Sequence, residues 1–391
     1  MDSRLYWIWL QQALGYGSQL AAPALHRFIE PQALYEADRR TLEEAGFGRV
    51  RKLQDKSLEA ARAVLTRVRE CGDWLLTPAD AAYPELLRGI YAPPLVLYGR
   101  GVVPDTDRQP VIAVVGTREI TQSGYDITFR LSAGLTAGGA LIVSGCARGA
   151  DTAALTGSLQ AGGRPLSVQA CGLDVEYPLE NASLRRAILA SGGTLLTEYA
   201  YGVRPYRGCF SARNRLMSGL SHGVCVTEAP AKSGALITAT WAREQGRDVF
   251  AIPGAITAPN SQGSNTLIQK GAYLVRNACE VLREYDMLFP DILDLSAAEK
   301  AFDRPDASVG EFSDARAQAG RKPQAQAQKP ACPAGASETA RRVFAELNEQ
   351  PRLVDEVAAA LSLSIPETMA ALTELEMLGG AHGHAGQQYS L

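Results

Sequence analysis

Apolar residues follow different patterns along the chain. Over residues 1–75 they recur at helical spacing in short stretches separated by Gly and Pro, such as LYWIWLQQALG, APALHRFI and TLEEAGF. Such stretches predict a small helical domain, similar to helix-hairpin or SAM domains. Residues 76–108 are rich in Pro and predict a connector with one short strand at LVLYG.

From residue 109 to residue 301, strand-like and helix-like stretches alternate. The strand-like runs are VIAVVG (111–116), ALIVSG (140–145), PLSVQA (165–170), TLLTEY (194–199), GVCVTEA (223–229) and DVFAIPG (248–254). Strands that are apolar on both faces and alternate with helices are typical of a parallel sheet covered by helices on both sides. We therefore expect an α/β fold, with an extended Rossmann-like parallel sheet as the core.

The last part of the chain has a third pattern. Residues 302–336 are polar, aperiodic and rich in Pro, Gln and Ala, which predicts a flexible linker. Residues 337–391 contain helical stretches at ETARRVFAELNEQ, LVDEVAAALS and IPETMAALTELEMLGG, followed by a short strand, QQYSL. Helices in this order with a terminal hairpin indicate a winged-helix domain.

Composition narrows the class of protein. The 7 Cys residues form no CxxC pair and there are only 4 His residues, which fits a reducing cytoplasm and argues against disulfides or a metal site. No apolar run reaches the roughly 18 residues of a membrane span, and the N-terminus lacks the features of a signal peptide. We expect a cytoplasmic protein that has no membrane span and uses neither a metal nor a cofactor.

Charge is distributed unevenly along the chain. The overall net charge of −3 gives no argument for nucleic acid. Residues 200–250, however, contain 7 basic and 3 acidic side chains, a net charge of +4, whereas residues 337–391 contain 3 basic and 8 acidic side chains, a net charge of −5. The third helical stretch of the winged helix has no basic residue, although a DNA-reading helix needs Arg or Lys. We therefore predict that this domain binds a protein rather than DNA.

Candidate chemistry lies at the carboxyl ends of the predicted strands. The sequences there are GTRE (116–119), SGCARGAD (144–151) and EAPAKSGA (228–235), and RNR (213–215) precedes the fifth strand. Each strand end combines Gly or Ser with a cation and a helix start, whose free N–H groups bind phosphate. Because ligands of such sheets bind beyond the carboxyl ends of the strands, these segments predict an anion site. Arg148 is the central cation of SGCARGAD; the alternative is an ordinary strand–helix turn.

The motifs of nucleotide-binding enzymes are missing from these segments. VVGTREITQSG is not GxGxxG, and neither GxxxxGK[ST] nor PGGxGTxxE occurs. Separated cations along one edge instead suit a polyanion that spans several phosphates, which favours single-stranded nucleic acid. Catalysis has little support, because His222 follows a helix end, and Glu198 and Glu228 are better explained as counter-charges for the Arg cluster than as an acid–base couple.

The series of motifs resembles the DprA (DNA-processing protein A) family of bacteria. The matching stretches occur in the family's order: VVGTR, VSGCARGAD, GLDVEYPLEN, ARNRLMSGLS, TEAPAKSGALITA, DVFAIPG and QGSNTLIQKGA. The resemblance implies a non-catalytic homodimer that binds single-stranded DNA and loads the RecA recombinase. In natural transformation such a protein protects incoming DNA and helps to displace single-strand-binding protein.

The resemblance also implies which residues contact DNA. These are Gly116, Thr117, Arg118, Ser144, Gly145, Arg148, Gly149, Arg213, Asn214, Arg215, Lys232, Ser233 and Gly234. Phe210 either stacks on a base or is a core aromatic residue. The family's dimer contact lies near the segment matching SNTLIQKGA, which points to Leu267 and Ile268.

This chain departs from the family pattern at two places. Leu155 stands where the family usually has His, which weakens any hydrolytic role, and Ser211-Ala212 stands where Pro often precedes RNR. Cys146 is interpreted as a small buried filler. Two rival functions stay open. The first is an enzyme of the same fold that cleaves a nucleotide or a phosphoribosyl group, and the second is a transcription regulator that reads duplex DNA through the winged helix.

Overall fold

The computed structural model describes residues 2–303, 332–333, 335–347, 352–361, 363–384 and 388–390. They form two separate units, one before and one after residues 304–331. The linker predicted over residues 302–336 therefore lies largely outside the described residues.

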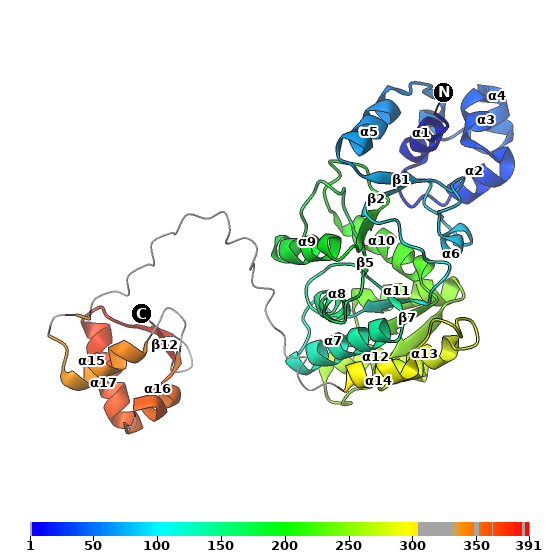
Figure 1. The fold of residues 1–391 in the computed structure, drawn as a ribbon. Helices are drawn as coiled ribbons and strands as arrows, with labels where there is room; N and C mark the ends of the chain where they lie inside the picture. Colours follow the sequence, from blue (N-terminus) through cyan, green and yellow to red (C-terminus); the bar gives the residue numbers. More distant parts are fainter. Residues whose placement is uncertain are drawn as a thin grey trace. The chain divides into compact units, whose positions relative to one another are not determined.

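A nine-stranded sheet forms the centre of the first unit (Figure 1). Its parallel strands at the positions of the apolar runs are β3 (Val111–Val115), β4 (Leu141–Ser144), β5 (Leu166–Val168), β6 (Thr194–Thr197), β7 (Gly223–Val226) and β8 (Asp248–Ala251). Their order is β6-β5-β4-β3-β7-β8, so the strand order reverses between β3 and β7. This doubly wound arrangement confirms the expected Rossmann-like fold and places a ligand crevice at the reversal.

Short strands extend the sheet at both edges. At one edge, β2 (Leu97–Gly101) pairs antiparallel with β6, and β1 (Trp74–Leu76) pairs with β2. At the other edge, β9 (Tyr273–Leu274) pairs parallel with β8. The strand predicted at LVLYG is thus present as β2, and it is part of the main sheet.

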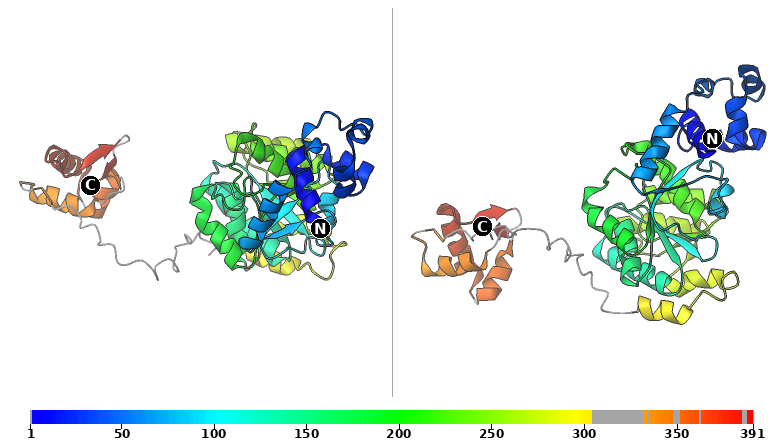
Figure 2. Two further views of the ribbon diagram at one scale, coloured as in Figure 1. Left: turned by 90° about the horizontal axis from the view of Figure 1, so that it is seen from above. Right: turned by 45° about the horizontal axis from the view of Figure 1, so that its top comes forward.

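Successive side chains of the central strands enter different apolar layers. Val111, Ala113 and Val115 of β3 pack on one face, whereas Ile112 and Val114 pack on the other. The first face is covered by α6 (Glu85–Arg88), α10 (Arg207–Leu220), α11 (Gly234–Glu244) and α12 (Gln262–Gln269). The second is covered by α7 (Gln122–Ala137), α8 (Ala150–Gln160), α13 (Ala278–Leu282) and α14 (Leu295–Phe302) (Figure 2). α9 (Ala182–Ala190) packs beside α8.

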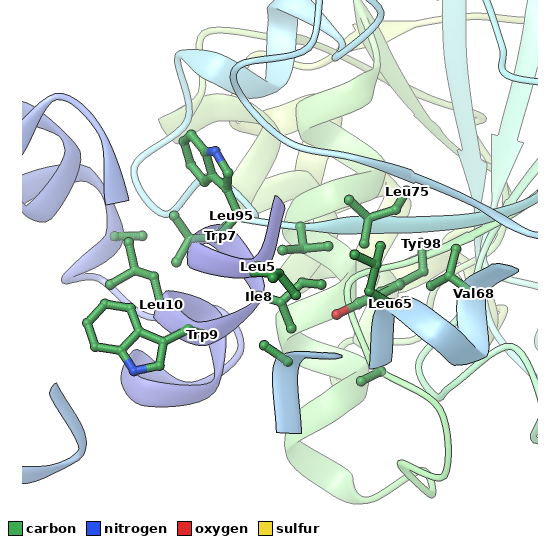
Figure 3. Packing of buried hydrophobic residues seen from close by; sticks show 14 of the residues in the cluster. Leu5, Trp7, Ile8, Trp9, Leu10, Leu65, Val68, Leu75, Leu95 and Tyr98 are labelled. Carbon is green, nitrogen blue, oxygen red and sulfur yellow. The ribbon is translucent and has the colours of Figure 1, made fainter. Parts of the chain in front are cut away.

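Helices precede the sheet, as the apolar spacing predicts. They are α1 (Arg4–Leu14), α2 (Ala21–Phe28), α3 (Pro31–Glu36), α4 (Arg39–Glu44), the 3-10 turn η1 (Arg51–Gln54) and α5 (Glu59–Glu70). The α1 side chains from Leu5 to Leu10 are all buried, and their apolar core continues into the sheet region through Leu75, Leu95 and Tyr98 (Figure 3). The helical region and the sheet therefore share one hydrophobic core.

The second unit has the predicted winged-helix pattern. Its elements are α15 (Glu338–Glu346), β10 (Arg352–Leu353), α16 (Val354–Leu361), α17 (Ile365–Met377), β11 (His382–His384) and β12 (Gln388–Ser390). The strands form a small sheet in the order β10-β12-β11. Val343, Phe344, Leu372 and Leu375 are among the side chains of its apolar core.

The dimer residues predicted on α12 lie in different environments. Leu267 is buried in the core of its own chain, whereas Ile268 packs against this core and is partly exposed. A direct contact between Leu267 and a second copy is therefore not supported.

Two general features concern the described part of the chain. None of its helices combines the length and the hydropathy that crossing a membrane requires. Its His, Cys, Asp and Glu side chains form no cluster that could hold a metal ion.

Helices α7 and α8 approach each other closely at Gly157, where an added Cβ would lie 2.2 Å from the carbonyl oxygen of Phe129. Ala in place of Gly normally stabilises a helix by up to about 1 kcal/mol. Here the clash reverses the sign, and we expect Gly157→Ala to lower the free energy of unfolding by about 1–3 kcal/mol in urea denaturation.

Gly89→Ala is the matched control, because φ at Gly89 is −86° and an added Cβ meets no atom within 4 Å. It should stay within about 0.5 kcal/mol of the parent chain. Equal stability of the two variants would contradict the close approach of α7 and α8.

Candidate functional site

An open pocket of about 860 Å³ lies at the carboxyl end of the sheet, where the strand order reverses between β3 and β7. Its wall consists of residues 115–119, 147, 151, 205–207, 210–211, 213–214, 217, 230, 232–235 and 237–238. Segments that follow β3, β4 and β7 thus meet the first part of α10. The pocket brings together most of the residues predicted to contact DNA.

The wall carries exposed positive charge. Arg118, Arg207 and Lys232 are exposed, and none of them pairs with an acid among the described residues. The acids of the wall are Glu119, which is exposed, and Asp151, which is buried. The accessible charge in the pocket is therefore net positive, as an anion site requires.

Two helices begin in the pocket wall and add to this positive potential. α10 and α11 have no acidic residue in their first turns, so their unpaired N–H groups and dipoles favour an anion. The Ser233 side chain caps α11 by accepting a hydrogen bond from the Ala235 N–H at 3.3 Å, and Gly234 is the first residue of the helix. Ser233, Gly234 and Lys232 are thus placed together, as the sequence predicts.

Carboxylates of the chain itself lie at the starts of α7 and α8. The Glu228 carboxylate accepts hydrogen bonds from the Thr121 N–H at 3.0 Å and the Thr121 hydroxyl at 2.5 Å, at the start of α7. The Asp151 carboxylate accepts one from the Ala147 N–H at 3.2 Å, just before α8. A carboxylate at each of these two starts opposes the phosphate binding that the sequence predicts there.

Arg213 is buried and links two strand ends. Its guanidinium donates to the carbonyl oxygens of Gly145 at 2.6 Å and Val168 at 2.5 Å, which follow or end β4 and β5. Gly145 leaves room for it, because a Cβ there would lie 2.2 Å from Nη1 of Arg213. Burial lowers the pKa of Arg213 and raises that of Asp151, and the opposite charges of these two groups counteract both shifts. Arg213 therefore shapes the pocket wall, with only 4% of its surface exposed.

The neighbours of Arg213 point elsewhere, because α10 begins at Arg207 and the RNR residues lie within it. The Asn214 side chain donates to the carbonyl oxygen of Gly234 at 3.3 Å and so positions the start of α11. Arg215 forms a buried ion pair with Glu198 and is absent from the pocket wall. Arg215 is thus only 3% exposed and lies away from the wall, and its predicted contact with DNA stays a prediction.

The small residues at the ends of β3 and β4 allow the loops that follow these strands to pack closely against each other. Gly149 has φ +76°, and a Cβ there would lie 2.5 Å from the Thr117 carbonyl oxygen, which accepts a hydrogen bond from the Ala150 N–H at 3.1 Å. A Cβ on Gly116 would lie 2.6 Å from that of Ala150. Ser144 is fully buried and donates to the Val114 carbonyl oxygen at 2.8 Å. Of these residues, Gly116 and Thr117 line the pocket, whereas Gly149 and Ser144 support it.

Arg148 lies outside the pocket wall. Its side chain is 65% exposed, and its Nη1 atom is 3.9 Å from Oε1 of Glu180. In the same loop, Cys146 is buried, and burial raises the pKa of its thiol to about 11, which fits an unreactive filler. Leu155 lies in the apolar core next to the N-terminal helices.

Phe210 belongs to the pocket wall and is partly buried. The guanidinium carbon of Arg118 lies 4.8 Å from its ring centroid, and the Tyr177 ring lies 5.7 Å away. Tyr206, Arg207 and Ile237 also line the pocket but were not predicted as site residues. The basic and aromatic run RPYRGCF was the available signal, and its Pro and Gly obscured the start of α10.

A doubly wound sheet with an open, cationic pocket at its reversal point defines a Rossmann-like protein. The family model for DNA recombination-mediator protein A matches residues 74–286, and the model of the DprA winged helix domain matches residues 326–387. The chain belongs to the DprA family.

Similar proteins cover much of the chain. Protein Smf of Synechocystis is 33% identical over 399 residues, which cover 99% of this chain and 98% of that protein. DNA processing protein DprA of Streptococcus pneumoniae is 43% identical over 207 residues, which cover 53% of this chain and 72% of that protein.

Two solved structures share the fold. The X-ray structure of DprA from Streptococcus pneumoniae has a TM-score of 0.63 and 33% identity, and the match covers 73% of this chain and 98% of that one. A structure that describes the single-stranded DNA binding mode of DNA processing protein A from Helicobacter pylori has a TM-score of 0.50 and 30% identity, and the match covers 56% of this chain and 97% of that one.

Replacing Arg213 by Met keeps the volume but removes the charge and both hydrogen bonds to the strand ends. Because the buried Asp151 then loses its nearby cation, we expect Arg213→Met to lower the free energy of unfolding by about 3–5 kcal/mol. Asp151→Asn in addition should recover part of this loss in urea denaturation.

Arg148→Met in the adjacent loop is the control, and it should change stability by less than about 0.5 kcal/mol because its ion pair is exposed. If Arg213→Met were as stable as Arg148→Met, Arg213 would not hold the strand ends together.

Proposed function

We propose that this chain binds single-stranded DNA in the pocket between β3 and β7. The observation that carries the proposal is that one open cavity is surrounded by Arg118, Arg207 and Lys232, which have no acidic partner among the described residues, and by two helix N-termini without acids. The described binding of single-stranded DNA by the related Helicobacter pylori protein supports it. The proposed ligand is a strand whose successive phosphates lie along the wall.

Each part of the wall has a separate role in this proposal. The N–H groups at the starts of α10 and α11 hold phosphate oxygens, with Arg207 and Lys232 beside them. Phe210 offers its ring to a base, which contributes about 1–3 kcal/mol when such a base stacks. A single strand exposes its base faces, whereas a duplex does not, so the combination of cations and ring favours single-stranded DNA.

The wider role follows from membership of the DprA family. We propose that the bound strand is handed to the RecA recombinase in the cytoplasm during natural transformation, with displacement of single-strand-binding protein. In this proposal the chain protects incoming DNA, acts as a homodimer and catalyses no reaction. The pocket wall supports the proposal that the chain catalyses no reaction. It contains no His, and its Asp151 carboxylate already accepts a hydrogen bond from the Ala147 N–H.

The winged-helix unit is proposed to bind a protein. Residues 337–391 have a net charge of −5 by the count of 3 basic and 8 acidic side chains. Glu367 and Glu376 on α17 are exposed, so the helix that would enter a DNA groove presents carboxylates to phosphates. A protein partner avoids this repulsion.

Substitution of the pocket cations tests the DNA-binding proposal. We expect Arg118→Ala and Lys232→Ala each to weaken binding of oligothymidylate and to reduce the slope of log K against log salt by about 0.7, the value for one lost phosphate contact on a single strand. Fluorescence anisotropy over a salt series measures both quantities.

Lys300→Ala is the matched control, since Lys300 is an exposed Lys on α14, away from the pocket. It should leave affinity and slope unchanged. If all three variants bound as the parent chain does, or if duplex DNA bound as tightly as single strands, the proposed pocket function would be wrong.

Removal of residues 326–391 tests the role of the winged-helix unit. The truncated chain should bind single-stranded DNA within about twofold of the full chain, because an acidic unit contributes no phosphate contact. It should, however, promote less RecA assembly on DNA coated with single-strand-binding protein. Binding of duplex DNA by residues 326–391 alone would contradict the assignment to a protein partner.

A further inference from the structure

The side-chain contacts of Phe210 extend beyond the pocket wall. Tyr177 is not a wall residue, yet its ring lies 5.7 Å from that of Phe210 at an interplanar angle of 51°. On the pocket side, Arg118 lies 4.8 Å from the Phe210 ring centroid. Phe210 thus contacts both Arg118 of the pocket wall and Tyr177 outside it.

The residues next to Tyr177 extend this surface. Tyr177 is 38% exposed, and Leu179, at the start of η2 (Leu179–Asn181), is 70% exposed. Both belong to the segment 172–181, the last part of the connection between β5 and α9. An exposed aromatic ring and an exposed aliphatic side chain, separated in sequence only by Pro178, offer an apolar face of the kind on which nucleobases stack.

The segment is held firmly in place. The Asn181 side chain, which is 6% exposed, donates to the carbonyl oxygens of Cys146 at 2.9 Å and Ala147 at 3.2 Å. The Arg185 guanidinium donates twice to the carbonyl oxygen of Val175, both at 3.1 Å. The Asn181 bonds hold the end of the segment against the loop that carries Arg148, and the Arg185 bonds hold its middle against α9, so the apolar face is in a defined position near that cation.

Charge determines how a strand meets this face. Glu176 and Glu180 are exposed and repel phosphates, so a strand turns its bases rather than its backbone toward the segment. Arg148 is the nearby cation, and its contact with Glu180 is 3.9 Å long, with side-chain exposures of 65% and 61%. An ion pair this exposed contributes little to stability and yields to a phosphate.

We propose that Tyr177 and Leu179 form a second nucleotide subsite for single-stranded DNA, outside the pocket and next to Phe210. This proposal rests on the proposed function of the pocket. The subsite takes the base of a nucleotide that follows the one stacked on Phe210. Arg148 leaves Glu180 and contacts a phosphate of this part of the strand.

Binding of thymidine oligonucleotides to the full chain tests the subsite by fluorescence anisotropy. Tyr177→Ala should weaken binding by about 5- to 150-fold, which corresponds to the loss of one stacked base. Tyr177→Trp should retain the affinity, and its added indole fluorescence should be quenched when DNA binds. Leu179→Ser, at a residue too exposed to unfold the chain, should weaken binding by about two- to fivefold.

Glu180→Gln removes the carboxylate that competes with a DNA phosphate for Arg148. It should tighten binding about two- to fivefold, because an exposed ion pair is worth at most about 1 kcal/mol, and Arg148→Ala should abolish this gain. Unchanged affinity in Tyr177→Ala and Leu179→Ser, or an unquenched indole in Tyr177→Trp, overturns the subsite.

Arg118→Ala distinguishes an error in the subsite proposal from an error in the proposed function of the pocket. If Arg118→Ala weakens binding while the segment variants bind as the parent chain does, the pocket function stands and the subsite is wrong. If Arg118→Ala and Lys232→Ala also have no effect, the pocket function itself is wrong.

Discussion

The site depends on one buried interaction, the guanidinium of Arg213 between the ends of β4 and β5. A charge with 4% exposure is costly to bury, and here it donates to the carbonyl oxygens of Gly145 and Val168. The loop after β4 then packs on the loop after β3 through Gly149, where a side chain would meet the Thr117 carbonyl oxygen. The position of the wall that carries Arg118 therefore depends on Arg213, a cation that is buried away from solvent.

Helix α10 connects this site to the rest of the first unit. Phe210 lies in the pocket wall, Arg213 reaches the strand ends, and Arg215 pairs with Glu198 on the opposite side. The Glu198 carboxylate also accepts a hydrogen bond from the Gly17 N–H at 3.3 Å, between α1 and α2. Helix α10 thus links the N-terminal helices to the proposed DNA site. The relative position of these helices and the site is therefore fixed.

The central strands, their covering helices and the winged-helix elements could be predicted because apolar periodicity alone defines them. The grouping of Arg118, Lys232 and Ser233 at one edge followed from the rule that parallel strands end together. The roles of Arg213 and Arg215 could not be predicted, since they depend on where α10 begins and on which helix face each side chain occupies. Arg148 was expected in the pocket, but its side chain lies outside the wall and 3.9 Å from Glu180, a proximity that only the folded chain shows.

The most direct test of the central claim is a crystal structure of the full chain with an oligothymidylate. The account predicts phosphates within hydrogen-bonding distance of the N–H groups at the starts of α10 and α11, beside Lys232 and Arg207, and a base stacked on Phe210. DNA bound on another surface, with the pocket between β3 and β7 empty, would contradict it.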